Sequence, residues 1–332
     1  MVSPYVSVIL PFRDAEATLA EALATLRCQS LSDFECLLID NESADRSASV
    51  AATVCRLDRR FTQLRQSGTL VAALNAGLAA ARAPYLARMD ADDLAHPKRL
   101  ELQLALLVRD SSLSIASALV SSFAAGRLQD GMQRYTAWVN SLRTPEEIRN
   151  GLFIESPLPH PTVLMRREAL AATRYREVDG PEDYDLWMRL LLLGHRAAKV
   201  PSILLRWRDS PRRLTRVGLQ YRQRSILETK WRYFPQVVAP GTSIQICGAG
   251  RTGKRWAMAL RARGYTIRRF VDVDLRKQGR SVCGAVVDDP SQLKPEDGFV
   301  LAAVGTPNAR EQIETYLRQF GLRPWQDYLA VA

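Results

Sequence analysis

The chain has 332 residues, of which 47% are hydrophobic and 24% are charged, a composition typical of a soluble globular protein. This length is sufficient for two domains, and no apolar run reaches the roughly 18 residues that a membrane-spanning helix needs. The N-terminus lacks the features of a signal peptide, and the five cysteines form no paired motif. We therefore expect a cytoplasmic protein with reduced thiols.

The net charge of +11 favours an anionic partner: nucleic acid, an anionic membrane surface, or a substrate that carries phosphate. No basic run is interleaved with aromatic residues and no zinc-finger pattern is present, so we expect no nucleic acid partner. The densest basic stretch spans residues 206–224. It has three interpretations: a solvated helix face, a phosphate clamp, or a peripheral contact with the inner face of the membrane.

The first half of the chain alternates apolar strands with helices. β-Branched apolar runs predict buried strands at residues 6–10 and 34–39, and a helix is predicted between them. This order predicts an α/β fold with a mostly parallel sheet, in which ligands bind at the carboxyl ends of the strands. Polar residues follow three predicted strands, at 11–14, 40–45 and 90–93. We therefore expect these three segments to form one site.

Three carboxylates close the strand that begins at Tyr85, at positions Asp90, Asp92 and Asp93. Such a cluster repels itself unless a cation or several hydrogen-bond donors are present. It is either a solvated acidic turn, where Asp is common, or a cation site.

Two further groups of polar residues have alternative interpretations. Glu182 and Asp183 crowd the start of a predicted helix, where acids complement the helix dipole by roughly 0.3–1 kcal/mol each. The dipole would also keep a carboxylate ionised at neutral pH, as a general base requires. His160 is either a histidine satisfied by the backbone or a residue at the rim of the site. Asp130 and Gly131 indicate a turn.

Near the C-terminus, a strand predicted at residues 243–247 runs into Gly248-Ala249-Gly250-Arg251-Thr252-Gly253. A helix and a second strand that ends at Asp272 follow, which is the dinucleotide-binding fingerprint. The glycines and the acid predict a second nucleotide site, made of Gly248, Gly250, Gly253 and Asp272. The alternative is a docking or stabilising domain whose glycines only permit tight packing.

Four motifs together resemble the family-2 glycosyltransferases of the GT-A fold: residues 6–11, 38–45, 73–77 and 87–93. The family usually has Asn, Asp and Gly where this chain has Asp14, Asn41 and Glu42. Residues 205–215 resemble the family's segment that closes over the donor. The resemblance implies that Asp90 and Asp92 bind Mn²⁺ or Mg²⁺. It also implies that Asp183 is the catalytic base, with Glu182 beside it, and that His160 lies on the acceptor side. The residues that it implies for donor binding are Pro11, Arg13, Asp40, Asn75, Asp90, Arg208 and Arg213.

The resemblance implies an inverting, metal-dependent enzyme of the hexosyltransferase type. It would move a sugar from a nucleoside-diphosphate donor, expected to be UDP-linked, to a hydroxyl of a glycan or lipid-linked acceptor. Residues 1–218 would form the transferase domain and 219–240 a helical linker. Residues 241–332 resemble the nucleotide-sugar-binding front domain of sugar acyltransferases. The alternatives are an NAD(P)-dependent oxidoreductase that uses the C-terminal glycines, and a non-catalytic nucleotide-sugar-binding protein.

Overall fold

The computed structural model describes residues 4–171, 173–210, 218 and 223–332. The chain divides into two compact units. The first consists of Met1–Arg149 and Pro157–Thr229, and the second of Asn150–Ser156 and Lys230–Ala332. Residues 150–156, which the expected division places in the transferase domain, therefore belong to the C-terminal unit.

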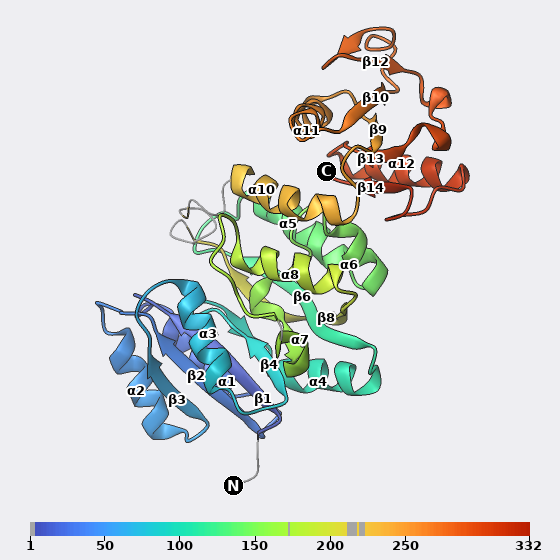
Figure 1. Cartoon of the computed structure of the whole chain (residues 1–332). Helices are drawn as coiled ribbons and strands as arrows, with labels where there is room; N and C mark the ends of the chain where they lie inside the picture. Colours follow the sequence, from blue (N-terminus) through green and yellow to red (C-terminus); the bar gives the residue numbers. More distant parts are fainter. Residues whose placement is uncertain (1–3, 172, 211–217, 219–222) are drawn as a thin grey trace. The chain divides into compact units, whose positions relative to one another are not determined.

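A mostly parallel sheet forms the centre of the first unit (Figure 1). Its strands are β1 Val6–Phe12, β2 Phe34–Asp40, β3 Phe61–Arg65, β4 Tyr85–Arg88, β5 Leu94–Ala95, β6 Leu113–Phe123, β7 Leu164–Arg166 and β8 Arg196–Arg208. Their order among the described residues is β3-β2-β1-β4-β7-β6-β8-β5. Strands β1 to β4 pair in parallel, as do β6 and β8, whereas β7 and β5 run antiparallel to their neighbours.

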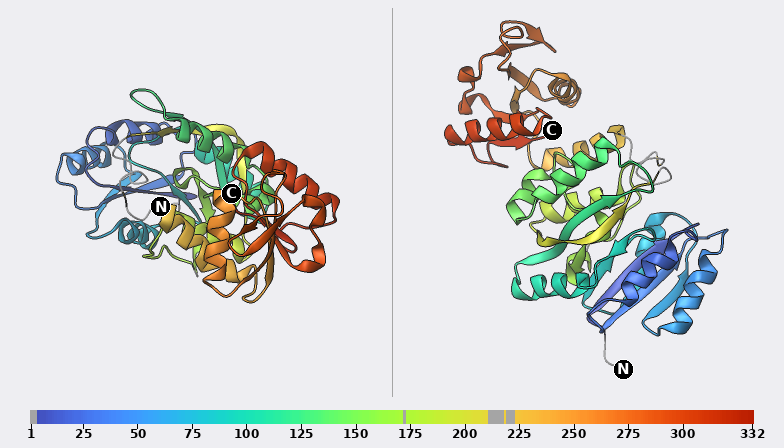
Figure 2. Two further views of the ribbon diagram at one scale, coloured as in Figure 1. Left: turned by 90° about the horizontal axis from the view of Figure 1, so that it is seen from above. Right: turned by 180° about the vertical axis from the view of Figure 1, so that it is seen from behind.

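The helices of the first unit follow the predicted alternation. They are α1 Leu19–Arg27, α2 Ser47–Leu57, α3 Leu70–Ala80, α4 Arg99–Arg109, α5 Asp130–Ser141, α6 Pro145–Gly151, α7 Arg167–Ala171, α8 Glu182–Leu192 and α10 Gln223–Tyr233, with the 3-10 turn η1 His160–Thr162. Helices α6 and α10 continue from the first unit into the second. Helix α4 packs against β6 and β8, which Figure 2 shows from behind.

The interpretation of residues 130–131 as a turn is wrong, because these residues begin helix α5. Asp is favoured both in turns and in the first turn of a helix, so local composition did not separate the two. Strand β6, which follows α4, was also not predicted.

The two faces of β1 explain how the first sheet is covered. Its residues are all buried, and Val6, Val8 and Leu10 share one hydrophobic cluster with Leu19 and Leu23 of α1. Because alternate side chains of a strand point to opposite faces, the residues between them face α3 on the other side. The chain therefore builds two helical layers around one buried strand.

The second unit is a smaller α/β sheet with β9 Ser243–Cys247, β10 Thr266–Val271, β11 Ser281–Val282, β12 Ala285–Asp288, β13 Phe299–Ala302 and β14 Tyr328–Ala330. The strand order is β11-β12-β10-β9-β13-β14 among the described residues, and all pairs except β11 with β12 are parallel. Helices α11 Arg251–Arg261 and α12 Pro307–Gln319 lie on opposite sides of the sheet (Figures 1 and 2). Three 3-10 turns complete it: η3 Phe234–Gln236, η4 Pro290–Gln292 and η5 Pro295–Asp297.

This architecture confirms the predicted α/β class with a mostly parallel first sheet and a second α/β region. Within the described residues, no helix has both the length and the apolar character needed to cross a membrane.

Candidate active site

The carboxyl ends of β1, β2 and β4 bring the three predicted polar segments together. Phe12 at the end of β1 pairs with Asp40 at the end of β2. Beyond these ends, the Ala44 amide donates to Asp14 Oδ1 at 2.8 Å, and the Thr18 hydroxyl donates to the Ala91 carbonyl at 3.0 Å. The segment after β1 is therefore tied both to the loop after β2 and to the acidic loop after β4.

The acidic loop forms a cluster that fits a divalent cation. Asp90, Asp92 and Asp93 each offer one carboxylate oxygen, and these oxygens all lie within 4.8 Å of one another. Asp93 is fully buried, and its Oδ1 accepts a hydrogen bond from the Arg208 backbone amide at 2.8 Å. Carboxylate oxygens are the hard ligands that Mg²⁺ and Mn²⁺ prefer, so these residues could hold such a cation.

Arg208 ends β8 and contacts the acidic loop. Its Nε donates to the Asp92 carbonyl at 2.7 Å, its Nη2 donates to Glu21 at 2.6 Å, and its guanidinium lies over the ring of Phe123. These contacts stabilise the loop itself. The predicted phosphate contact of Arg208 stays a prediction, and Arg213 lies outside the described residues.

The other predicted donor residues surround the same edge. Pro11 lies within buried β1, and Asp40 is buried and accepts a hydrogen bond from the Ser43 amide at 3.0 Å. Arg13 is exposed. Asn75 of α3 donates to the Tyr175 carbonyl at 3.0 Å, and its Oδ1 is buried with no hydrogen-bond partner among the described residues.

Glu182 and Asp183 occupy the first turn of α8, where Glu182 is buried and Asp183 is partly exposed. Burial, and next the neighbouring charge of Glu182, raise the pKa of Asp183 to about 8. These two effects oppose the expected influence of the helix dipole on the ionisation of this carboxylate. Desolvation and a like charge on the adjacent residue outweigh a dipole that contributes only about 1 kcal/mol.

His160 is buried between two site residues rather than at a rim. Its Nε2 forms a 2.7 Å hydrogen bond with the Tyr175 hydroxyl, and its Nδ1 lies 3.8 Å from Glu182 Oε1. Burial, and then the charge of Arg88, lower the pKa of His160 well below its ordinary value, so the ring is neutral. Tyr175, which sequence reasoning missed, thus joins His160 to Asn75 of α3.

Two buried arginines were also missed. Arg88 ends β4 with a side chain that is 6% exposed, and it forms an ion pair with Asp90. Arg99 of α4 is fully buried, and its Nη2 donates to the Arg88 carbonyl at 2.7 Å. The available signal was a basic residue at the end of an otherwise apolar strand, two positions before a carboxylate.

The glycine-rich loop of the second unit has a defined structural role. Gly248 has a φ of +104°, and a Cβ at Gly253 would lie 1.9 Å from the Gly248 carbonyl oxygen. Asp272 Oδ2 accepts hydrogen bonds of 2.8 Å from the Ala249 amide and from Lys277 Nζ. Asp272 is the acid that the dinucleotide fingerprint would offer to a ribose. Its Oδ2 therefore already has hydrogen-bond partners within the chain. A side chain at Gly250 would meet open space, and the second nucleotide site stays a prediction.

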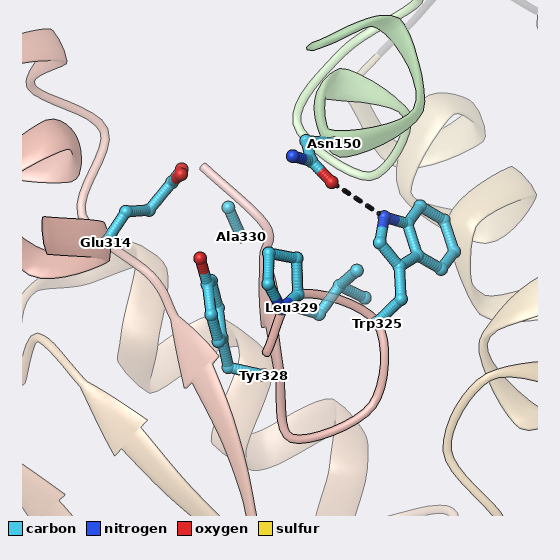
Figure 3. Close-up of a pocket in the computed structure, with 7 residues that line it drawn as sticks. Asn150, Glu314, Trp325, Tyr328, Leu329 and Ala330 are labelled. Atoms are coloured by element: carbon cyan, nitrogen blue, oxygen red, sulfur yellow. Dashed lines mark hydrogen bonds between the residues drawn. The ribbon is translucent and has the colours of Figure 1, made fainter. Parts of the chain in front are cut away.

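A small pocket also lies in the second unit, between α6 and the segment around β14 (Figure 3). Trp325 Nε1 donates to Asn150 Oδ1 across it at 3.0 Å, and Glu314, Tyr328, Leu329 and Ala330 line it. Its volume of about 10 Å³ leaves room for about one water molecule. The pocket is therefore too small for a substrate.

The sheet order and the strand-end carboxylates define a GT-A type glycosyltransferase fold. Residues 7–173 match the family model for Glycosyl transferase family 2. The chain therefore belongs to glycosyl transferase family 2, which confirms the predicted family and the enzyme class of glycosyltransferase.

Among relatives, the chain is 30% identical over 225 residues to the putative glycosyltransferase EpsE of Bacillus subtilis, covering 66% of this chain and 78% of that one. It is 28% identical over 202 residues to the amylovoran biosynthesis glycosyltransferase AmsE of Erwinia amylovora, covering 59% of this chain and 72% of that protein. The similarity to these relatives spans most of their length.

Two solved structures share the fold at low sequence identity. TarS 1–349 of S. aureus in complex with UDP-GlcNAc superposes with a TM-score of 0.53 and 16% identity, covering 70% of this chain and 66% of that one. The mannosyltransferase PcManGT of Pyrobaculum calidifontis, in complex with GDP-Man and Mn²⁺, superposes with a TM-score of 0.50 and 17% identity. The match covers 71% of this chain and 63% of that one.

Proposed function

We propose that this glycosyltransferase moves a sugar from a nucleoside diphosphate to an acceptor hydroxyl, with inversion at the anomeric carbon and with a divalent cation. The observation that carries the proposal is the acidic loop after β4, where Asp90, Asp92 and Asp93 offer carboxylate oxygens within 4.8 Å of one another. Asp90 forms an ion pair with Arg88, whose amide donates to the Val163 carbonyl just after the turn that contains His160. His160 in turn lies 3.8 Å from Glu182, which supports a donor site and an acceptor site in one region of the fold.

On the donor side, the acidic loop would hold the diphosphate through a cation. Asp90, Asp92 and Asp93 are the residues that would bind Mg²⁺ or Mn²⁺. The bound cation supplies positive charge that stabilises the departing diphosphate. Pro11 and Asp40, at the ends of β1 and β2, would line the nucleotide. The two fold neighbours are complexes with UDP-GlcNAc and with GDP-Man, which supports a nucleotide-sugar donor, and we propose UDP as the nucleotide.

On the acceptor side, Asp183 would act as the base. It takes the proton from the acceptor hydroxyl while that oxygen forms a bond to the anomeric carbon, and the bond from this carbon to the diphosphate oxygen breaks. A base with a pKa near the working pH is effective in such a transfer. Glu182 and the neutral His160 would position the acceptor and Asp183. The acceptor class that we propose is a glycan or a lipid-linked sugar.

The donor site is tested by thermal unfolding with a panel of nucleoside diphosphates and nucleotide sugars, with and without Mn²⁺. A ligand at about 100 times its Kd stabilises by about 2.7 kcal/mol, which corresponds to roughly 5–10 °C for a unit of this size. We expect this shift with Mn²⁺ present and its loss in Asp92→Asn.

Asp33→Asn is the matched control, because Asp33 is exposed just before the amino end of β2. It should keep the full shift. An equal shift in Asp92→Asn and the unchanged protein, or stabilisation by NAD(P) alone, would contradict the proposal.

A further inference from the structure

Helix α11 of the second unit has one buried face and one exposed basic face. The helix packs against β9 and β10. Its buried residues recur at helical spacing and are Gly253, Trp256, Ala257 and Leu260. The exposed residues of the opposite face are Arg251, Lys254, Arg255, Met258 and Arg261. We call these five residues the α11 basic face.

The charges of the α11 basic face are not neutralised by neighbouring acids. No aspartate or glutamate occurs between Glu228 and Asp272 in the sequence. None of the four basic side chains on this face forms an ion pair with a residue that the structure describes, whereas Arg269 of β10 pairs with both Asp288 and Asp297. Helix α12, on the opposite side of the sheet, carries two arginines and two glutamates and so has no net charge (Figure 1). The second unit therefore presents uncompensated positive charge at α11.

This positive charge does not stabilise the helix itself. The first turn of α11 contains no acidic residue, and its N-cap, Gly250, forms no side-chain cap hydrogen bond. Arg251, Lys254 and Arg255 instead place positive charge near the amino end, where the helix dipole favours negative charge. The stability of the fold therefore does not account for the α11 basic face, whereas a negatively charged partner does.

The composition of the face favours a lipid surface over nucleic acid. Proteins that bind single-stranded nucleic acid stack its bases on exposed aromatic side chains. Trp256, the aromatic residue of α11, is only 2% exposed and packs against Trp231. Met258, among the basic residues, is 62% exposed. Its apolar side chain gains nothing from a phosphate backbone, but at a membrane surface it leaves water for the boundary between headgroups and acyl chains.

We propose that the α11 basic face binds the surface of a membrane that contains anionic lipids. The four basic side chains contact lipid phosphates, and Met258 enters the boundary between headgroups and acyl chains. This interaction goes beyond the proposed transfer reaction, and its test requires no enzymatic activity. The face is also distinct from the basic stretch at residues 206–224, of which residues 211–217 and 219–222 lie outside the described residues.

The experiment measures co-sedimentation of the full chain with phosphatidylcholine vesicles, with and without anionic phosphatidylglycerol. We expect binding to the anionic vesicles alone, and its loss at about 0.5 M salt, where surface charges are screened. In the double variant Lys254→Gln, Arg255→Gln the partition coefficient should fall about 30-fold, since each basic residue near an anionic surface contributes about fivefold. The unfolding temperature of this variant should not fall, because the two charges oppose the helix dipole.

The double variant Arg59→Gln, Arg109→Gln is the matched control. Both arginines are exposed in the first unit, and neither forms an ion pair with a described residue. This variant loses the same net charge and should keep vesicle binding. Equal loss of binding in the two double variants would overturn the proposal, as would equal binding to neutral and anionic vesicles. Loss of binding to a single-stranded oligonucleotide but not to vesicles in the α11 variant would overturn it too.

Hydroxyl-radical footprinting tests which side of the second unit contacts the vesicle. Oxidation of Met258 should fall several-fold when anionic vesicles are added. Oxidation of Phe320, which is 44% exposed at the end of α12, should stay unchanged. Equal protection of both residues, or no protection of Met258, would overturn the assignment to α11 even if the protein binds vesicles.

Discussion

At the scale of single residues, Asp183 shows how a site residue can reduce the stability of its own fold. Burial and the charge of Glu182 raise the pKa of Asp183 to about 8, against an ordinary value of 3.8. The folded protein therefore binds this proton more tightly than the unfolded chain does. The proton on Asp183 therefore contributes to the stability of the folded protein. This contribution is complete below pH 3.8 and is lost as the pH rises through about 8.

We predict that Asp183→Asn raises the unfolding temperature more at pH 9 than at pH 5, because the amide carries no charge to bury. The unfolding temperature should rise by roughly 2–4 °C for each kcal/mol added to the free energy of unfolding. Calorimetry at the two pH values measures it. Asp185→Asn, two residues along α8, is the control, since it breaks a buried 2.8 Å ion pair with Arg189 and should destabilise at both pH values. A lower unfolding temperature of Asp183→Asn at pH 9 would show that the carboxylate is stabilised there.

Another residue-scale feature concerns the departures from the family pattern. Asp14 and Glu42 have φ values of 48° and 58°. The family usually has Asn and Gly at these positions, and those residues tolerate this left-handed conformation best. The left-handed backbone at positions 14 and 42 therefore explains why the family prefers Asn and Gly there, and ligand binding is not the only reason for that preference.

At the scale of elements, the approach of α3 to β1 depends on a glycine. A Cβ at Gly77 would lie 2.5 Å from Ile9 Cγ2 and 3.3 Å from Ile9 Cγ1. Ile9 is itself buried within the sheet, so a side chain at position 77 would displace the strand or the helix. Both elements lead to predicted donor residues, namely Pro11 and Asn75. The packing of this pair therefore also sets the geometry of the candidate site.

We predict that Gly77→Ala destabilises the first unit. Overpacking costs about 1–3 kcal/mol, and the better helix propensity of Ala returns at most about 1 kcal/mol. Gly131→Ala is the matched control, because Gly131 also lies in a helix, α5, but a Cβ there meets nothing within 4 Å. This control should be neutral or stabilising. Urea unfolding compares the two variants, and equal stabilisation by both would contradict the close packing of α3.

The same elements show what the sequence predicts well. The strands predicted at residues 6–10 and 34–39 are present as β1 Val6–Phe12 and β2 Phe34–Asp40, because buried parallel strands are continuous apolar runs. The contribution of β6 and the start of α5 were missed, since an alternating Ser/Ala strand and an Asp-Gly pair are locally compatible with other structures.

At the scale of the whole molecule, the second unit includes a segment from the middle of the chain. Phe153 is fully buried in that unit, with its ring 6.2 Å from the ring of Phe234 and 5.8 Å from that of Trp325. The C-terminal unit is therefore completed by residues 150–156, about 80 positions before its main sequence begins.

We predict that Phe153→Ala destabilises the second unit by about 3–5 kcal/mol, because it leaves a cavity among aromatic rings. Hydrogen exchange should become faster in β9 and β13 and remain unchanged in β1 and β2. Phe320→Ala serves as control, since Phe320 is 44% exposed, and it should change stability by no more than about 1 kcal/mol. Equal acceleration in both units, or none, would contradict this assignment.

The sequence by itself determined the α/β class, the order of the first strands, and the carboxylates at their ends. Hydrophobic periodicity and turn chemistry are local, and the carboxyl ends of parallel strands necessarily meet at one edge of the sheet. Only the tertiary structure decided that Tyr175 bonds to His160, that His160 lies beside Glu182, and that burial raises the pKa of Asp183. These properties depend on burial and on charges that are distant in the sequence, and no local pattern of residues encodes them.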